Sequence, residues 1–297
     1  MTNLKIITYN DAQLDNTVVA LGKFQGLHKG HMLLIEETVS IAKQYGKNSV
    51  VFTINAGNDK YINMPEERYS ILDSLGVDID VECIFNKEFS LMQPEDFVKK
   101  VLIDKLNASY VVVGNDFRFG YNRTGDIFTL IELGAKYGFE VKSFEKLCVE
   151  DNVISSSLIR KLLEEGKVNE VEKYMGRPYF ISGTVVHGKK LGRTIGFPTI
   201  NVIPDSRKLT PLNGVYETRI NIDGTYYKGI TNIGNNPTVE DIDIIKVETN
   251  IIDFDKDIYD LNVVIEFIRF IRSEKKFNNI QELQNQIKKD KIMIMHQ

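Results

Sequence analysis

The chain has 297 residues, about twice the length of an ordinary single domain, so its length predicts two domains. Its 42% hydrophobic and 26% charged residues suit a protein with buried cores and exclude disordered and fibrous classes. A formal net charge of −4 argues against a protein built around nonspecific nucleic-acid binding. The sequence shows neither a membrane-spanning run nor a signal-peptide pattern, so we expect a cytoplasmic protein that binds no membrane.

Strands and helices alternate from the start of the chain to about residue 150. Expected strands cover residues 17–22, 48–54, 81–85, 109–114 and 140–144, and expected helices cover 30–46, 65–76, 94–106 and 126–138. The first of these helices should bury Leu33, Leu34, Val39 and Ile41. Such alternation predicts a Rossmann-like α/β domain whose parallel sheet is covered on both faces.

The pattern of expected elements changes after a helical connection over residues 154–176. Strand-like runs at 181–188, 214–234, 245–254 and 261–271 follow without helices between them, and Asp223-Gly224 is a strong hairpin signal. These runs predict an antiparallel barrel or sandwich, and residues 279–294 predict a terminal amphipathic helix. We place the domains at 1–165 and 176–297, with a linker at 166–175.

The two cysteines, Cys83 and Cys148, each lie in an apolar, strand-like run. Neither is part of a CxxC or Cys/His spacing that would indicate a metal site, so we expect two reduced, buried thiols.

The segment GKFQGLHKGH (22–31) lies between the first expected strand and its helix, where ligands bind in parallel sheets. Its glycines let backbone approach an anion closely, and the N–H groups of the helix start favour phosphate. His28 and His31 could donate hydrogen bonds to the same polyphosphate. The alternative is a capping turn with incidental histidines.

This segment resembles the HxGH signature of nucleotidylyltransferases, in particular the GxFDGxHxGH of prokaryotic FAD synthetases. VGNDFRFGYNRTGD (113–126) and ISSSLIR (154–160) resemble two further motifs of that family, in the same order. The resemblance implies that His28 and His31 are catalytic and that ATP is bound by Gly22, Phe24, Gly30, Asp116, Arg118, Ser156, Ser157 and Arg160. A structural Asp116–Arg118 pair and a plain helix cap at ISSSLIR are the competing interpretations.

The second half resembles riboflavin kinase throughout. Residues 176–202 match its GxPYxxxGxVxxGxxxGRxxGFPTAN region, with Ile200 in place of Ala, and the resemblance predicts a β-barrel. It implies that Gly188 and Arg193 bind ATP and that Thr199 and Asn201 bind Mg²⁺ and nucleotide phosphates.

Phosphorylating an alcohol calls for a base, and Glu248 on the strand KVETNI can serve. Lys246 and Asn250 should share its face of the strand. The resemblance implies that Glu248 accepts the proton of the ribityl 5′-hydroxyl. Arg272 is expected either to bind the flavin or to be a surface charge, and His187 is expected to be structural or a weak nucleotide contact.

The whole chain thus resembles bifunctional riboflavin kinase/FMN adenylyltransferases. That resemblance implies two reactions: riboflavin and ATP giving FMN and ADP, then FMN and ATP giving FAD and pyrophosphate. The FMN phosphate is already ionised, so the second reaction needs orientation and charge stabilisation rather than a base.

Two departures affect the first domain alone: Gln25 replaces an aspartate, and FTINAGND (52–59) lacks the family's Pro-His-Pro. One alternative is therefore an active kinase with a degenerate nucleotide-binding or regulatory first domain. A weaker alternative is a nucleotidylyltransferase acting on another phosphorylated substrate.

Overall fold

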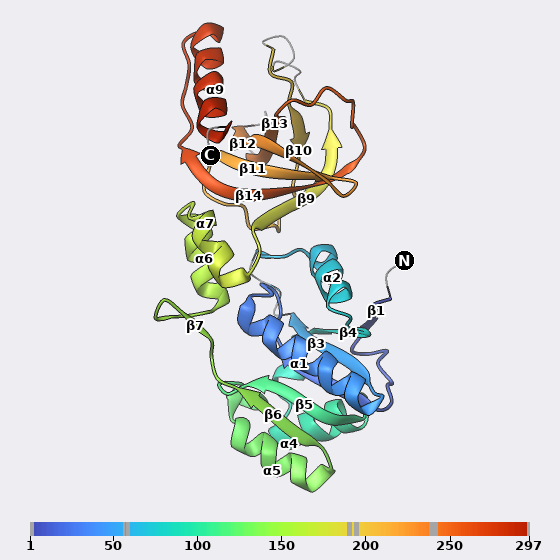
Figure 1. Cartoon of the computed structure of the whole chain (residues 1–297). Helices are drawn as coiled ribbons and strands as arrows, with labels where there is room; N and C mark the ends of the chain where they lie inside the picture. The colour runs from blue at the N-terminus through green and yellow to red at the C-terminus, as the bar shows by residue number, and fades with distance from the viewer. Residues whose placement is uncertain are drawn as a thin grey trace. The chain divides into compact units, whose positions relative to one another are not determined.

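The computed structural model describes residues 3–295 except 56, 58–59, 189–191, 193–195 and 238–242. The chain divides into two compact units, Met1–Ser156 and Ser157–Gln297, which are described separately (Figure 1). No helix in the described ranges is long and apolar enough to cross a bilayer.

The first unit is built on a parallel six-stranded sheet in the order β1-β4-β3-β2-β5-β6. Its strands are β1 (Lys5–Thr8), β2 (Thr17–Gly22), β3 (Asn48–Asn55), β4 (Ile79–Ile84), β5 (Ala108–Gly114) and β6 (Glu140–Phe144). Each neighbouring pair is parallel, as the alternation of elements predicts. Strand order reverses between β2 and β5, so a crevice for ligands is expected at their carboxyl ends.

Helices cover both faces of this sheet. They are α1 (Lys29–Tyr45), α2 (Pro65–Ser74) and α5 (Ile127–Tyr137), with short α3 (Lys87–Ser90) and α4 (Pro94–Phe97). Along β2, Val18 and Ala20 pack in the core under α1, whereas Val19 and Leu21 pack in the core that includes Leu130 of α5. Because both faces of β2 are buried, its sequence is one continuous apolar run.

Three local expectations for this unit are corrected. Strand β1 was not expected, because it lies at the sheet edge with mostly exposed side chains and therefore carries a weak apolar pattern. The helix expected at 94–106 is α4 followed by a π-helical segment, Val98–Ile103. On α1, Leu33 is only partly buried, and Ile35 takes its place in the core.

The second unit is a closed antiparallel barrel in the order β10-β13-β12-β11-β14-β9, which confirms the barrel (Figure 1). Its strands are β9 (Tyr179–Val186), β10 (Ile200–Val202), β11 (Gly214–Ile222), β12 (Thr225–Pro237), β13 (Asp243–Ile251) and β14 (Asn262–Arg272). Asp223 (φ 48°) and Gly224 (φ 84°) form the expected β11–β12 turn with two left-handed residues.

In the part of this unit that the structure describes, the barrel is accompanied by α6 (Ser156–Glu164), α7 (Val168–Met175) and the terminal α9 (Ile280–Met295). The expected linker at 166–175 is largely α7, which contacts β9 and β14. The domain limits 1–165 and 176–297 stay a prediction. Ile294 of α9 is buried with Val215 and Ile230 of the barrel, which fixes the helix on the barrel core.

The cysteines divide between core and surface. Both are free thiols, and Cys83 on β4 is buried as predicted. Cys148 is exposed, contrary to prediction, because β7 (Cys148–Val149) pairs only with β8 (Asn152–Val153) in a two-stranded hairpin. A strand-like apolar run is buried only when a second layer covers it.

Candidate active sites

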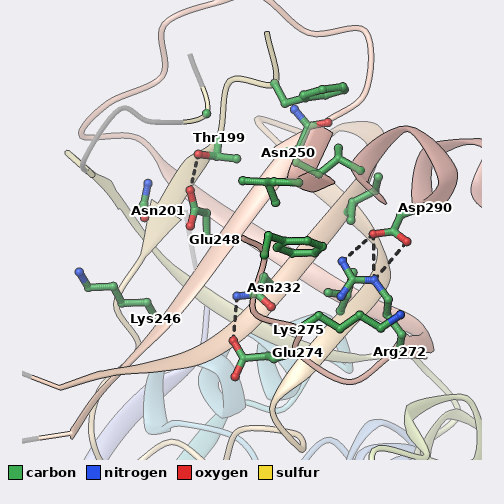
Figure 2. A pocket seen from close by; sticks show the side chains of 17 residues that line it. Thr199, Asn201, Asn232, Lys246, Glu248, Asn250, Arg272, Glu274, Lys275 and Asp290 are labelled. Carbon is green, nitrogen blue, oxygen red and sulfur yellow. Dashed lines mark hydrogen bonds and ion pairs between the residues drawn. The ribbon is translucent and has the colours of Figure 1, made fainter. Parts of the chain in front are cut away.

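A cavity of about 410 Å³ lies between the barrel strands and α9, and its polar end is formed by β13 and by β10 with the residue before it (Figure 2). The register places Asn201 opposite Glu248. Lys246, Glu248 and Asn250 line the cavity, and the alternate residues Val247 and Thr249 are fully buried in the barrel. The period-two alternation of a strand therefore turns the Glu248 carboxylate toward the cavity.

Thr199 lies directly beside this carboxylate. Its hydroxyl Oγ1 donates a hydrogen bond of 2.7 Å to Glu248 Oε1, shown as a dashed line in Figure 2. The amide of Asn250 donates to the Pro198 carbonyl at 2.7 Å, which ties the segment before β10 to β13. Thr199, Asn201 and Glu248 thus form one group of oxygen-bearing side chains on adjoining strands.

Two glycines pack closely against this group. A Cβ added to Gly188 would overlap the Asn201 amide, and one added to Gly192 would lie 3.1 Å from Thr199 Oγ1. Gly188 therefore supports Asn201 through its lack of a side chain. Arg193, expected to bind ATP from the same loop, lies outside the described residues.

Thr199 also lines a second cavity, of about 400 Å³. Its wall is continued by the β13–β14 connection, which contributes Phe254, Lys256 and Tyr259. The His187 ring lies against the Tyr259 ring, with centroids 3.8 Å apart. Sequence reasoning missed this connection, because its polar, aromatic residues are typical of an ordinary surface loop. The two cavities thus share Thr199, the residue that contacts Glu248.

The remaining wall of the first cavity comes from the end of β14, the segment after it and α9. Arg272 is not the surface charge that was one expectation: its side chain is only 16% exposed and pairs with Asp290 at 2.8 Å. Asp290, Asn232 and Lys275, also on the wall, were not predicted. Asp290 could have been found from its helical spacing with the apolar Leu283 and Ile287.

The first unit carries a smaller cavity, of about 240 Å³, at the turn from β2 into α1. His28 caps α1: its Nδ1 accepts the backbone N–H of His31 at 3.2 Å, and the two rings stack with centroids 3.7 Å apart. Both rings line the cavity together with Gly22 and Gly30. The capping turn is therefore confirmed, and the binding of a polyphosphate by the two rings stays a prediction.

His31 is held as a neutral ring. Burial, with a smaller contribution from neighbouring His28, keeps the pKa of His31 well below its ordinary value. Its Nδ1 is buried and meets no hydrogen-bond partner within the part of the chain that the structure describes. A buried polar atom without a partner is costly, and a ligand in this cavity could satisfy it.

Backbone strain shapes this turn. Phe24 (φ 36°) and Leu27 (φ 37°) are fully buried in the left-handed region that bulky side chains rarely adopt. The Phe24 ring packs edge-on to His31, with centroids 5.2 Å apart, and a Cβ on Gly22 would lie 3.0 Å from it. Phe24 supports the histidine from the core and does not line the cavity.

The residues expected to bind adenosine do not pair with each other. Asp116 lines the cavity and forms an ion pair of 2.8 Å with Lys146, another cavity residue that sequence reasoning missed. Arg118 lies 4.0 Å from Asp126, the cap of α5, and is not part of the cavity wall. The competing interpretation, an Asp116–Arg118 pair, is therefore wrong.

The ISSSLIR motif spans the division between the two units. Ser156 lines the cavity, and its hydroxyl would lie 3.2 Å from a Cβ added to Gly26. Ser157 and Arg160 follow it on α6 in the second unit, so their approach to this cavity stays a prediction. Gln25, the departure from the family pattern, donates from Nε2 to Asn55 at 3.4 Å.

Comparisons with known proteins agree with this division of the chain. The FAD synthetase family model matches residues 10–158, and the riboflavin kinase family model matches residues 175–296. A crystal structure described as a macrolide-efflux protein from Streptococcus pneumoniae has a TM-score of 0.89 and 30% identity, covering 98% of this chain and 99% of that one.

Two curated relatives carry the name bifunctional riboflavin kinase/FMN adenylyltransferase. The protein of Bacillus subtilis is 37% identical, and that of Listeria monocytogenes is 35% identical; each match covers 93% of this chain and 90% of the relative. Matches over both halves do not favour the alternative of a degenerate first domain. The chain belongs to the bifunctional riboflavin kinase/FMN adenylyltransferase family.

Proposed function

We propose that the domain over residues 176–297 phosphorylates riboflavin with ATP to give FMN and ADP, and that the domain over residues 1–165 adenylylates FMN to FAD with release of pyrophosphate. The main support for the kinase reaction is the contact of Thr199 with Glu248, because Thr199 lines both of the larger cavities. One cavity can hold the alcohol and the other the nucleotide. We expect both reactions to take place in the cytoplasm.

Glu248 is the proposed general base. The Thr199 hydroxyl donates to one of its oxygens and so fixes the carboxylate beside a residue that lines both cavities. Glu248 then accepts the proton of the ribityl 5′-hydroxyl as that oxygen attacks the γ-phosphorus, and the bond to the ADP oxygen breaks. Positioning and charge stabilisation supply the rest of the rate enhancement.

Phosphoryl transfer from ATP generally requires a divalent metal, and we propose Mg²⁺. The residues fit it: Thr199 and Asn201 offer uncharged oxygens beside Glu248, and Mg²⁺ is usually held by few protein oxygens together with phosphates and water. When bound, the metal neutralises charge on the transferred phosphate. Gly188 supports this group by keeping Asn201 in place.

The adenylyl-transfer site works without a base. The ring of His28 and the neutral ring of His31, together with the N–H groups at the start of α1, can donate hydrogen bonds to the ATP phosphates as pyrophosphate leaves. We propose that Gly22, Gly30, Asp116 and Ser156, which line the cavity, bind ATP here. The ATP contacts that the resemblance implies for Arg118, Ser157 and Arg160 stay predictions. Phe24 would act by supporting His31.

Product chromatography tests both halves. The purified chain is incubated with riboflavin, ATP and Mg²⁺, and then with FMN, ATP and Mg²⁺, in oxidised and reduced conditions. We expect FMN and FAD from the first mixture and FAD from the second. No FMN from riboflavin would refute the kinase, and no FAD from FMN would refute the adenylyltransferase.

A further inference from the structure

A buried carboxylate stands at the edge of the kinase cavity, on the last helix of the chain. The side chain of Asp290 is 1% exposed. Burying a carboxylate is costly unless it is paired and hydrogen-bonded, and Asp290 is both. Arg272 Nη2 donates to Oδ2 at 2.8 Å, and Gln286 Nε2, one turn earlier on α9, donates to Oδ1 at 2.8 Å.

The guanidinium of Arg272 is fixed on more than one side. Its Nε lies 3.2 and 3.1 Å from the two oxygens of Asp290, and Nη1 donates to the Ser273 carbonyl at 3.1 Å. Such a multidentate arrangement fixes the plane of the arginine as well as its position. Figure 2 shows this pair away from the Thr199 and Glu248 contact, with the rest of the cavity between them.

The surroundings of the pair suit an uncharged aromatic ligand. Phe277, Leu283 and Ile287 form the adjoining apolar wall of the cavity. An isolated arginine would bring an unbalanced positive charge into this wall, whereas the pair with Asp290 is neutral overall. Riboflavin is uncharged, and its ring carbonyls can accept hydrogen bonds from a guanidinium held in place.

We propose that Asp290 is a positioning residue of the kinase reaction: it holds Arg272 at the cavity wall and joins α9 to β14, so that riboflavin affinity depends on this contact. This inference rests on the proposed kinase function. Asp290 does not touch the reacting atoms, so its loss should raise the KM for riboflavin and leave kcat nearly unchanged.

The same helix offers a matched control. Lys291, the next residue on α9, forms an ion pair of 3.0 Å with Asp253 on the barrel, outside the wall of the cavity. Asp253 is 73% exposed, so this pair contributes little to stability. Asp253→Asn removes a contact between α9 and the barrel without disturbing Arg272.

The experiment measures riboflavin phosphorylation and riboflavin binding, the latter by flavin fluorescence, in the full chain. We expect Asp290→Asn to raise KM and Kd for riboflavin on the order of tenfold with kcat within about twofold, as small displacements of a binding group can do. Asp290→Glu should recover part of the affinity, and Asp253→Asn should match the wild type. An unchanged Kd in Asp290→Asn, or an equal effect of Asp253→Asn, would overturn the proposal.

A double variant separates loss of the contact from misfolding. Arg272→Gln combined with Asp290→Asn removes both charges, so it avoids the unpaired buried charge that makes single substitutions destabilising. In a double-mutant cycle, the double variant should bind riboflavin with a Kd no higher than that of Arg272→Gln alone, because Asp290 acts through Arg272. Additive effects contradict this. If the wild type neither binds riboflavin nor forms FMN, the proposed function fails as well; if it does both, only the role of Asp290 is in question.

Discussion

The cavity beside the barrel is lined by the carboxylate of Glu248, whereas the cavity at the start of α1 is lined by two imidazoles. Glu248 lines the first and is held by the Thr199 hydroxyl. In the second, the Asp116 carboxylate is engaged by Lys146, and neutral His31 lies beside His28. The proposed reactions account for this difference: an alcohol must lose a proton as it attacks, but a phosphate is already ionised. Two phosphate-handling sites in one chain therefore need different side chains.

The largest expected effect separates the sites through Glu248. Glu248→Gln keeps the size of the side chain but removes the base, so FMN formation from riboflavin should fall by about 10²–10⁴-fold. FAD formation from added FMN should not change. Chromatography of both reactions measures this, with Glu266→Gln on β14 as the control, since Glu266 pairs with Arg219 rather than with cavity residues. Unchanged FMN turnover in Glu248→Gln would show that Glu248 is not the base.

The converse effect is expected at His28. Asparagine is a good helix cap, so His28→Asn keeps an acceptor for the His31 backbone N–H and removes the ring. FAD formation should fall by roughly 10²–10³-fold, as after loss of a charge-stabilising donor, while FMN formation and the melting temperature stay near those of the wild type. A variant with full FAD synthesis would leave His28 with a capping role alone.

A smaller effect is expected from Gly188→Ala in the barrel. The added Cβ would overlap the Asn201 amide and displace it from the group beside Glu248. A displacement of this size should lower the kinase kcat by about tenfold and raise the Mg²⁺ concentration needed for half-maximal rate. Steady-state rates over a Mg²⁺ titration measure both. Wild-type behaviour would mean that Asn201 does not need this close packing.

The smallest effect concerns pH and the first unit. Because the pKa of folded His31 lies below its unfolded value of about 6.5, the unfolded chain takes up the proton first. This contribution to stability is fully present above pH 6.5 and is lost as the pH falls below it. As the pH falls from 8 to 5, the melting temperature should therefore fall less for His31→Leu than for the wild type. Identical slopes would contradict a depressed pKa for this histidine.

Most of the fold could be predicted from the sequence, because the local patterns agree with the tertiary structure. The apolar run of β2 and the Asp223-Gly224 turn specify their own conformations. Burial was harder to predict, since it depends on which layer covers a segment: Cys148 is exposed on a hairpin that no layer covers, and β1 is an edge strand. Periodicity also cannot settle which of Leu33 and Ile35 faces the core.

The same limit applies to the sites. Lys246, Glu248 and Asn250 were expected to share one face because strand alternation is a local property. Asp290 was missed because its partner Arg272 is 18 residues earlier in the chain, and only the docking of α9 brings them together. The pairing of Asp116 with Lys146 likewise depends on the adjoining loop after β6. Contacts between elements, rather than the elements themselves, account for what the sequence did not predict.

One crossed product assay tests the central claim that the two sites act separately on successive substrates. Glu248→Gln and His28→Asn are each incubated with riboflavin and with FMN, in the presence of ATP and Mg²⁺, and the flavins are separated by chromatography. We expect Glu248→Gln to make FAD from FMN but very little product from riboflavin, and His28→Asn to make FMN from riboflavin but little FAD from either. Loss of both reactions in either folded variant would contradict it.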